Sequence, residues 1–492
     1  MSTEILIRLI FSAIFGGILA WNFYSLSDRE KRVELQDKQR RYLSYPDPSM
    51  LPTILLMLLL MLLILDGWRS AGQFFLGLYV NLFFQISLYY VLLLLFLPLL
   101  RRCFQARTCA ALWLLPTMLY CTVYSFMELP RPAWVIRLPE GWLPWLALLW
   151  AAGFFAVLLG RTVSHLRFRR EILKPARPVE ELEAWEVSRL WDRLHREAGY
   201  PKRRYRLVVS PAVRTPVSIG LFSWSIRVVL PRLDYSLEDL ELILRHELVH
   251  IGRRDCSAKF FFTFCTALCW FNPLMWLAMG RSADDMERSC DETVLLDADD
   301  RKRRRYASLL LETAGDERGY TTCLSASAAA LRYRLKSVVH PGRRLGGSLL
   351  AGLLLFALMM TSGYVALTDP AGTGREVLFG GDPAGYTISY VSWKDGSGET
   401  FSGCDNPEEV LRLLADLPME HTSGLFSFSG SGTRLYLNCG DTEGSFSVTI
   451  YDEFLTVVPR NDLRNTEVYY LPQPIPEETL AALFREGTPL PF

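Results

Sequence analysis

The sequence predicts a mainly α-helical, polytopic membrane protein with one α+β domain between membrane helices and a second, small α+β domain at its C-terminal end. Half of the 492 residues are hydrophobic, and they gather in long runs with few charges rather than at the spacing of a soluble core. Longer polar stretches lie between and after these runs. The formal net charge is +1, so no basic excess indicates direct binding of nucleic acid.

The apolar runs predict six membrane spans, five of them before residue 165. The first is expected to be a retained anchor, because no small-residue cleavage site follows it as in a signal peptide. The second is the shortest, and a buried helical hairpin is the alternative for it. The predicted spans are 4–23, 50–66, 74–99, 108–127, 142–161 and 346–367.

Basic residues in the loops predict the orientation. Lys and Arg concentrate after the first, third and fifth spans, which marks those loops as cytoplasmic. The N-terminus and the C-terminal domain are then expected outside a multi-pass cell membrane. The expected division is a transmembrane region (1–164), a cytoplasmic domain (165–345), a transmembrane helix (346–367) and an extracytoplasmic α+β domain (368–492).

Residues 246–250 read HELVH, inside a segment with helical character. Ser236 can cap its amino end with Asp239 three residues on, and leucines recur afterwards at helical spacing. Two histidines four residues apart share one helix face, with Glu247 beside them. That spacing suits two ligands of a tetrahedral zinc ion and a general base. We therefore expect Zn2+ on His246 and His250, with Glu247 as the catalytic base.

A third zinc ligand is expected downstream. The apolar stretch 258–280 is long enough to cross a bilayer, but a crossing would place the acidic residues after it on the opposite side from the histidines. Asn272 and Pro273 interrupt the stretch, so we predict a hairpin of two helices. Glu287 would then be the third ligand, and Asp291 would accept a hydrogen bond from a ligating histidine. A solvated acidic face is the alternative.

The C-terminal segment predicts strands joined with two helices. Alternating stretches such as YTISYVSW and SFSVTIYDEFLTVV predict strands, and NPEEVLRLLADLP and IPEETLAALFREG predict helices. Cys404 and Cys439 are its only cysteines. In an oxidising compartment they are candidates for a disulfide, and two buried thiols are the alternative.

The motifs HELVH, NPLMW and ERSCDE, with PVSIGLFSWSIRVVLP before them, resemble the BlaR/MecR-type integral-membrane zinc metallopeptidases over about residues 165–367. The resemblance implies a zincin-like α+β peptidase domain. It also implies that His246, His250 and Glu287 bind zinc and that Glu247 is the base.

The stretch PVSIGL has the character of an edge strand, since apolar and polar residues alternate around Gly220. In zinc peptidases of this general kind, such a strand pairs with the substrate backbone by strand addition. The residues expected to do so are Ser218, Ile219, Gly220 and Leu221. An ordinary sheet strand is the alternative.

The resemblance further implies a signal transducer. An outer domain would sense a signal, and the inner peptidase would then cleave a cytosolic protein such as a transcriptional repressor, or the chain itself within residues 314–327. The sequence departs from the best known members in the outer domain. Lys394 is the only lysine after residue 369, and neither Ser-x-x-Lys nor Lys-Thr-Gly is present, which excludes a penicillin-binding sensor.

Two other functions stay open at this point. One is a housekeeping membrane protease similar to the HtpX or CAAX-processing enzymes, which the separate outer domain disfavours. The other is a non-enzymatic receptor with a structural zinc site, which Glu247 disfavours because such a site needs no base. The expected partners are the lipid bilayer, a repressor-like cytosolic substrate and an unidentified outer signal. A homodimer is compatible with the sequence.

Overall fold

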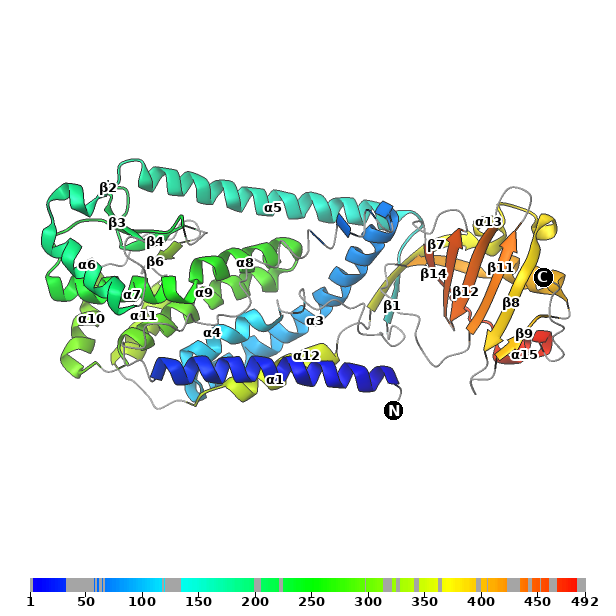
Figure 1. The fold of residues 1–492 in the computed structure, drawn as a ribbon, viewed down its shortest axis with the longest axis horizontal. Helices are drawn as coiled ribbons and strands as arrows, with labels where there is room; N and C mark the ends of the chain where they lie inside the picture. The colour runs from blue at the N-terminus through cyan, green and yellow to red at the C-terminus, as the bar shows by residue number, and fades with distance from the viewer. Residues whose placement is uncertain are drawn as a thin grey trace.

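The protein is elongated, with a small sheet among helices at one end and a larger sheet at the other (Figure 1). This arrangement is seen in a computed structural model. It describes residues 3–31, 57, 60–61, 64, 67–116, 119, 134–198, 205–220, 224–296, 298–312, 321–323, 328–339, 345–361, 365–394, 400–404, 406–422, 434–440, 445–451, 453–459 and 467–484.

Apolar helices occupy the middle of the molecule. Two segments in the described residues are long and apolar enough to cross a membrane, Leu82–Cys103 and Trp142–Leu173, and two shorter apolar helical segments are Leu9–Asn22 and Ser348–Met360. Five helices contain or adjoin these segments: α1 (Thr3–Lys31), α3 (Gly67–Cys103), α4 (Ala106–Leu114), α5 (Trp142–Leu173) and α12 (Ser348–Met360).

The six-span topology and its orientation therefore stay predictions. Most of the predicted span 50–66 and the second half of 108–127 lie outside the described residues. The predicted span 346–367 is too long, because α12 ends at Met360 and the chain is already a strand from Val365. α12 packs along α1, where Gly16 and Gly352 let the two backbones come close.

The inner sheet holds the strands around the HELVH helix. Its order is β2-β3-β5-β4-β6, with β3 parallel to β5 and the other pairs antiparallel. The strands are β2 (Arg177–Pro178), β3 (Arg206–Val209), β4 (Val217–Ile219), β5 (Arg227–Leu230) and β6 (Thr321–Cys323). The helices of this region are η3 (Val179–Leu182), α6 (Trp185–Glu197), α7 (Leu237–Arg253), α8 (Asp255–Leu268), α9 (Pro273–Val294), α10 (Asp300–Glu312) and α11 (Ala328–Val339).

The apolar stretch 258–280 forms the predicted hairpin. It is split between α8 and α9, and the Asn272 side chain accepts a hydrogen bond from Leu274 N at 3.0 Å with Pro273 in the first turn. Phe261 and Cys265 of α8 join a buried apolar cluster with residues of α3 and α4. The apolar character of the stretch thus serves helix packing, and the hairpin brings α9 back beside α7.

The prediction that PVSIGL forms an edge strand is wrong for the residues described. β4 lies inside the sheet order, because β6 pairs with it in antiparallel register, Ser218 opposite Thr322. Leu221 lies outside the described residues. Gly220 has φ +138°, and a Cβ there would lie 2.6 Å from Ser225 O, so the position directly after β4 requires glycine.

The C-terminal region forms a long, mostly antiparallel sheet of order β1-β7-β10-β14-β13-β12-β11-β8-β9. The strands and both helices predicted for it are present. Its elements are β7 (Val365–Thr373), α13 (Gly374–Val377), η4 (Pro383–Gly385), β8 (Thr387–Lys394), β9 (Thr400–Ser402), α14 (Pro407–Asp416), β10 (Pro418–Thr422), β11 (Arg434–Gly440), β12 (Ser445–Tyr451), β13 (Phe454–Pro459), β14 (Glu467–Tyr470) and α15 (Glu477–Phe484).

Two features of this sheet differ from expectation. Cys404 and Cys439 are buried thiols and do not form the candidate disulfide. The segment before α5, between the fourth and fifth predicted spans, contributes β1 (Trp134–Arg137), which pairs in parallel with β7. The loop before α5 and the C-terminal region therefore share one sheet.

Candidate metal centre

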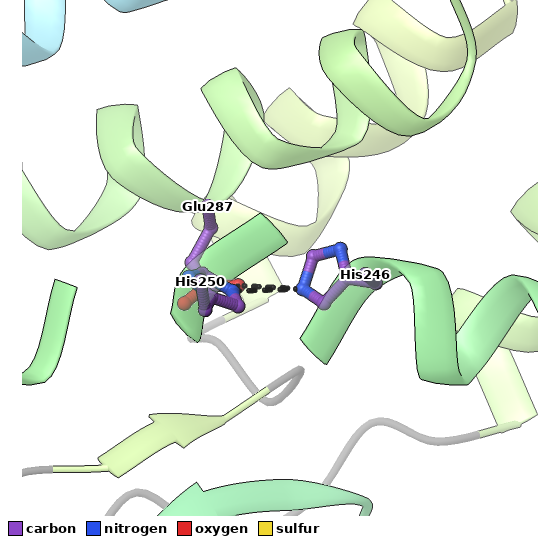
Figure 2. Close-up of side chains that lie close together, drawn as sticks. All are labelled: His246, His250 and Glu287. Carbon is purple, nitrogen blue, oxygen red and sulfur yellow. Dashed lines mark hydrogen bonds and ion pairs between the residues drawn. The ribbon is translucent and has the colours of Figure 1, made fainter. Parts of the chain in front are cut away.

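The two histidines of HELVH and Glu287 converge on one point. His246 and His250 project from α7 and Glu287 from α9, and Figure 2 shows the three side chains pointing toward one another. The Nε2 atoms of the histidines are 3.0 Å apart, and Glu287 Oε2 lies 3.5 Å from each of them. The helix is capped as predicted, with Ser236 Oγ accepting from Asp239 N at 3.2 Å. The spacing read from the sequence thus produces a shared face.

These three atoms fit a divalent metal. A tetrahedral zinc ion with bonds of about 2.0–2.1 Å separates its ligand atoms by about 3.3 Å, close to the distances found. All three residues are buried, and within the described part of the chain neither oxygen of Glu287 accepts a hydrogen bond. Lys259 Nζ, 3.6 Å from Oε1, and Arg334 Nη1, 3.4 Å from Oε2, offset part of the buried charge. Neither makes a hydrogen bond to Glu287, so its oxygens stay available as metal ligands. The residues present therefore suit a metal ion bound by two imidazoles and a carboxylate.

Glu247 is fully buried on the same helix and is held by the inner sheet. Ser218 Oγ of β4 donates a hydrogen bond to Glu247 Oε2 at 2.5 Å. Ser218 was expected to meet a substrate through its backbone, and the structure adds this side-chain contact. The strand and the predicted base are therefore joined directly, while Ile219 beside Ser218 packs in an apolar cluster.

The far side of the His250 ring meets a carboxylate directly. His250 Nδ1 lies 2.6 Å from Asp255 Oδ2 and 3.3 Å from Cys290 Sγ. Asp255 begins α8 after Arg254, whose φ of +59° ends α7 and turns the chain. Nδ1–H can thus donate to Asp255, which leaves Nε2 to bind a metal. Asp255 and Cys290 also form a second His/Cys/Asp group with His250, on the rear of the same ring.

The electrostatics favour an ionised Glu287 carboxyl. Burial disfavours its charged form, but His250 and His246 hold the pKa of Glu287 well below its usual range. Burial likewise opposes the charged form of His250, whereas Cys290, Glu287 and Asp255 raise the pKa of His250 well above its usual range. An ionised Glu287 carboxylate is suited to bind a divalent cation.

Asp291 lies behind His246, but it does not accept the direct hydrogen bond that was predicted. The distance from His246 Nδ1 to Asp291 Oδ1 is 3.5 Å, too long for a good hydrogen bond. The hydroxyl of Tyr306, from α10, lies between them, 2.8 Å from His246 Nδ1 and donating to Asp291 Oδ1 at 2.7 Å. Arg334 of α11 holds the same carboxylate, with Nε donating to Oδ2 and Nη2 to Oδ1, both at 2.7 Å.

A second polar cluster joins α9 to the apolar helices. Asp285, two residues before Glu287, accepts two hydrogen bonds from Arg101 at the end of α3, at 3.1 and 2.9 Å. Trp113 Nε1 and the hydroxyl of Tyr333 also donate to it, at 2.8 and 3.2 Å. The end of a candidate membrane helix is thus connected to the helix that carries Glu287.

Sequence reasoning missed Asp255, Tyr306 and Arg334, each of which contacts a candidate ligand or the carboxylate behind it. Asp255 stands five residues after His250 in HIGRRD, and its position directly after the helix was an available signal. Tyr306 and Arg334 lie 60 and 43 residues from the residues they contact, His246 and Asp291, and no local spacing marks them.

The comparisons with known proteins agree with this geometry. Residues 138–338 match the family model described as BlaR1 peptidase M56. The chain is similar to the regulatory protein BlaR1 of Bacillus licheniformis, 26% identical over 188 residues, which are 38% of this chain and 30% of that protein.

It is also similar to the methicillin resistance mecR1 protein of Staphylococcus aureus (strain Mu50 / ATCC 700699), 25% identical over 114 residues, 23% of this chain and 19% of that protein. The chain matches less than a third of the length of either relative. The family is one of metallopeptidases, and the motif-based resemblance to the BlaR/MecR type is confirmed over residues 138–338.

Proposed function

We propose that the protein is an integral-membrane zinc metalloendopeptidase that transduces a signal from an outer domain to a cytosolic substrate. The observation that carries this proposal is the placement of Glu247, buried and hydrogen-bonded, on the same helix as two histidines that meet Glu287. Three protein ligands and an adjacent carboxylate make up a catalytic rather than a structural zinc site. The match to the BlaR1 peptidase family supports the same reading.

Zinc on His246, His250 and Glu287 would polarise a scissile carbonyl and lower the pKa of a bound water. Glu247 would act as the general base toward the attacking water and would return the proton to the leaving amine. Ser218 fixes the carboxylate of Glu247 through its hydrogen bond, and Asp255 fixes the ring of His250. The peptidase activity would therefore depend on side chains from β4, α7, α8 and α9.

We infer the predicted topology, with the N-terminus and residues 368–492 outside and residues 165–345 cytoplasmic. Two contacts support it. β1, from a loop predicted to be outside, pairs with β7 of the predicted outer domain. His246, His250 and Glu287, all predicted to be inside, share one site. A seventh span at 258–280 would have separated them.

We propose a repressor-like cytosolic protein as the substrate, with the chain itself as a further one. β6 lies antiparallel to β4 in the arrangement that strand addition would give a substrate, and Ser218 of β4 contacts Glu247. β6 belongs to the segment 314–327 that was predicted to be accessible to a protease. A peptide substrate would have to replace this pairing or extend from it.

Glu247→Gln in the full-length membrane protein tests the proposal. Removing a general base reduces turnover by about 100- to 10,000-fold, so processing of a co-expressed repressor, or of the chain itself, should be lost while zinc content is kept. Glu241→Gln on the same helix is the matched control, because Glu241 pairs with Arg193 and Arg245 away from the site. Undiminished processing by the Glu247→Gln variant would contradict the peptidase proposal and favour a structural zinc site.

A further inference from the structure

The two histidines of the site are held from behind in different ways. Each must keep a proton on Nδ1 if Nε2 faces the metal. Asp255 Oδ2 accepts a hydrogen bond directly from His250 Nδ1–H at 2.6 Å. On the His246 side a phenol hydroxyl stands in the place where a carboxylate would be expected, so the outer contacts of the two ligands are not equivalent.

The Tyr306 hydroxyl can serve both of its neighbours at once. A hydroxyl accepts from one group while it donates to another. Here it accepts from His246 Nδ1–H at 2.8 Å and donates to Asp291 Oδ1 at 2.7 Å. Tyr306 is 2% exposed, so water does not compete for these bonds. The result is a three-member relay, His246 to Tyr306 to Asp291.

Arg334 fixes the far end of this relay. Its guanidinium makes two hydrogen bonds of 2.7 Å to Asp291, and Nη1 lies 3.4 Å from Glu287 Oε2. The residue is 0% exposed. One buried guanidinium therefore faces the two α9 carboxylates, one backing His246 and one a candidate ligand. The planar fork of arginine suits such paired contacts, which a lysine could not reproduce.

We propose that Tyr306 and Arg334 are positioning residues of the metal centre: they set the orientation of His246 and Glu287 from α10 and α11, outside the motif helices. The proposal rests on the proposed function only in taking His246, His250 and Glu287 as the metal ligands. Two helices beyond the α7–α9 core thereby contribute to metal binding. The chain segment that joins them, residues 313–327, carries β6, so the strand paired with β4 is connected at both ends to a positioning residue.

The test measures metal binding by the full-length protein in detergent. The variants are Tyr306→Phe, which removes only the hydroxyl, and Arg334→Lys, which keeps the charge but not the fork. Their matched controls are Tyr235→Phe and Arg332→Lys, the latter exposed on the same helix as Arg334. Zinc affinity is read by competition with a chelator, the ligand field by the absorption of Co2+-loaded protein, and folding by the thermal unfolding midpoint.

We expect each test variant to bind zinc about 10- to 100-fold more weakly than the wild type, the loss typical of removing an outer partner of a ligand. The Co2+ absorption bands should change in both, and the two controls should match the wild type. Without metal, the thermal unfolding midpoint of the Tyr306→Phe variant should differ little from that of the wild type. This result would separate a positioning role from general destabilisation.

Wild-type zinc affinity and an unchanged Co2+ spectrum in either folded variant would overturn the positioning role of that residue. Peptide cleavage is recorded separately. A wild type that binds zinc and cleaves nothing would contradict the proposed function and leave the positioning result standing. A wild type that cleaves, together with variants that bind zinc normally, would contradict the positioning proposal and leave the proposed function standing.

Discussion

The two ends of the molecule stabilise their cores differently. We call the part around the five-stranded sheet the inner region, and the part around the nine-stranded sheet, the outer sheet, the outer region. Around the inner sheet, buried ionised groups are paired with one another, as at Arg334 and Asp291. In the outer sheet the core is an apolar cluster that includes Val391, Leu437 and Val448. Within the described residues, the groups suited to a metal ion both lie in the inner region. The buried charges and the candidate metal ligands thus lie together in the inner region, whereas the core of the outer sheet is apolar.

The difference has an energetic consequence. Breaking one partner of a buried ion pair leaves an uncompensated charge and costs about 3–5 kcal/mol, more than the loss of a helix cap. The inner region should therefore respond strongly to single polar substitutions, and the outer region weakly. Three substitutions test this difference between the two regions.

The largest effect is expected for Asp285→Ala. Asp285 is 0% exposed and holds Arg101, Trp113 and Tyr333. Its loss should lower the free energy of unfolding by about 3–5 kcal/mol, because Arg101 loses its buried partner. Denaturant unfolding in detergent measures this. Asp284→Ala, next along α9, should cost well under half as much, since its pairing with the exposed Arg281 is 3.9 Å long. Equal losses would refute the assignment of the cost to the buried pair.

Gly220→Ala should have a smaller effect on the same region. A Cβ at Gly220 would lie 2.6 Å from Ser225 O and 2.7 Å from Ile226 Cα, and its φ of +138° suits only glycine. We expect a loss of about 1–3 kcal/mol in unfolding free energy, and reduced cleavage because β4 also holds Glu247 through Ser218. Gly280→Ala in α9 is the control, because nothing lies within 4 Å of the place that its methyl group would take and helix propensity favours alanine. A Gly220→Ala variant as stable as the control would show that the β4 turn can relax.

The sequence predicted those parts of the site that depend on spacing within one helix. HELVH places two histidines on one face whatever surrounds it, and Asn272–Pro273 marks a helix start by local chemistry alone. The prediction placed Asp291 on the correct helix face, toward His246. It did not include the hydroxyl of Tyr306, which lies between the two side chains. That hydroxyl comes from another helix, and its arrival depends on how α10 packs, which no periodicity encodes.

The same reason explains the errors in the sheets. The alternation in PVSIGL predicted a strand correctly, but which strand lies beside it is a long-range property. Its neighbour β6 comes about 100 residues later, with only three residues of strand in the structure. β1 likewise is four residues long and pairs with β7 more than 200 residues away. Short strands acquire their structure from partners, so their own residues predict little.

The smallest expected effect lies where the outer sheet meets α5. Asp369 of β7 accepts a hydrogen bond from Gly141 N at 3.0 Å, at the start of α5. Asp369→Ala should lower the free energy of unfolding by about 1 kcal/mol, the usual cost of losing a helix cap. Asp369→Asn keeps an acceptor and should cost less. Hydrogen exchange of the first turn of α5, beside equilibrium unfolding, measures both.

The pH dependence of stability shows whether the contact between Asp369 and Gly141 depends on a charged or a neutral carboxyl group. Burial raises the pKa of Asp369, so the folded protein holds a proton at pH values where the unfolded chain has lost it. Stability should then increase as the pH falls through the raised pKa toward about 4, the ordinary aspartate value, and the Asp369→Asn variant should lack this gain. Unfolding at pH 7 and pH 5 compares them. If the wild type instead lost stability on acidification relative to Asp369→Asn, the contact would depend on a paired charge, and the outer region would resemble the inner one after all.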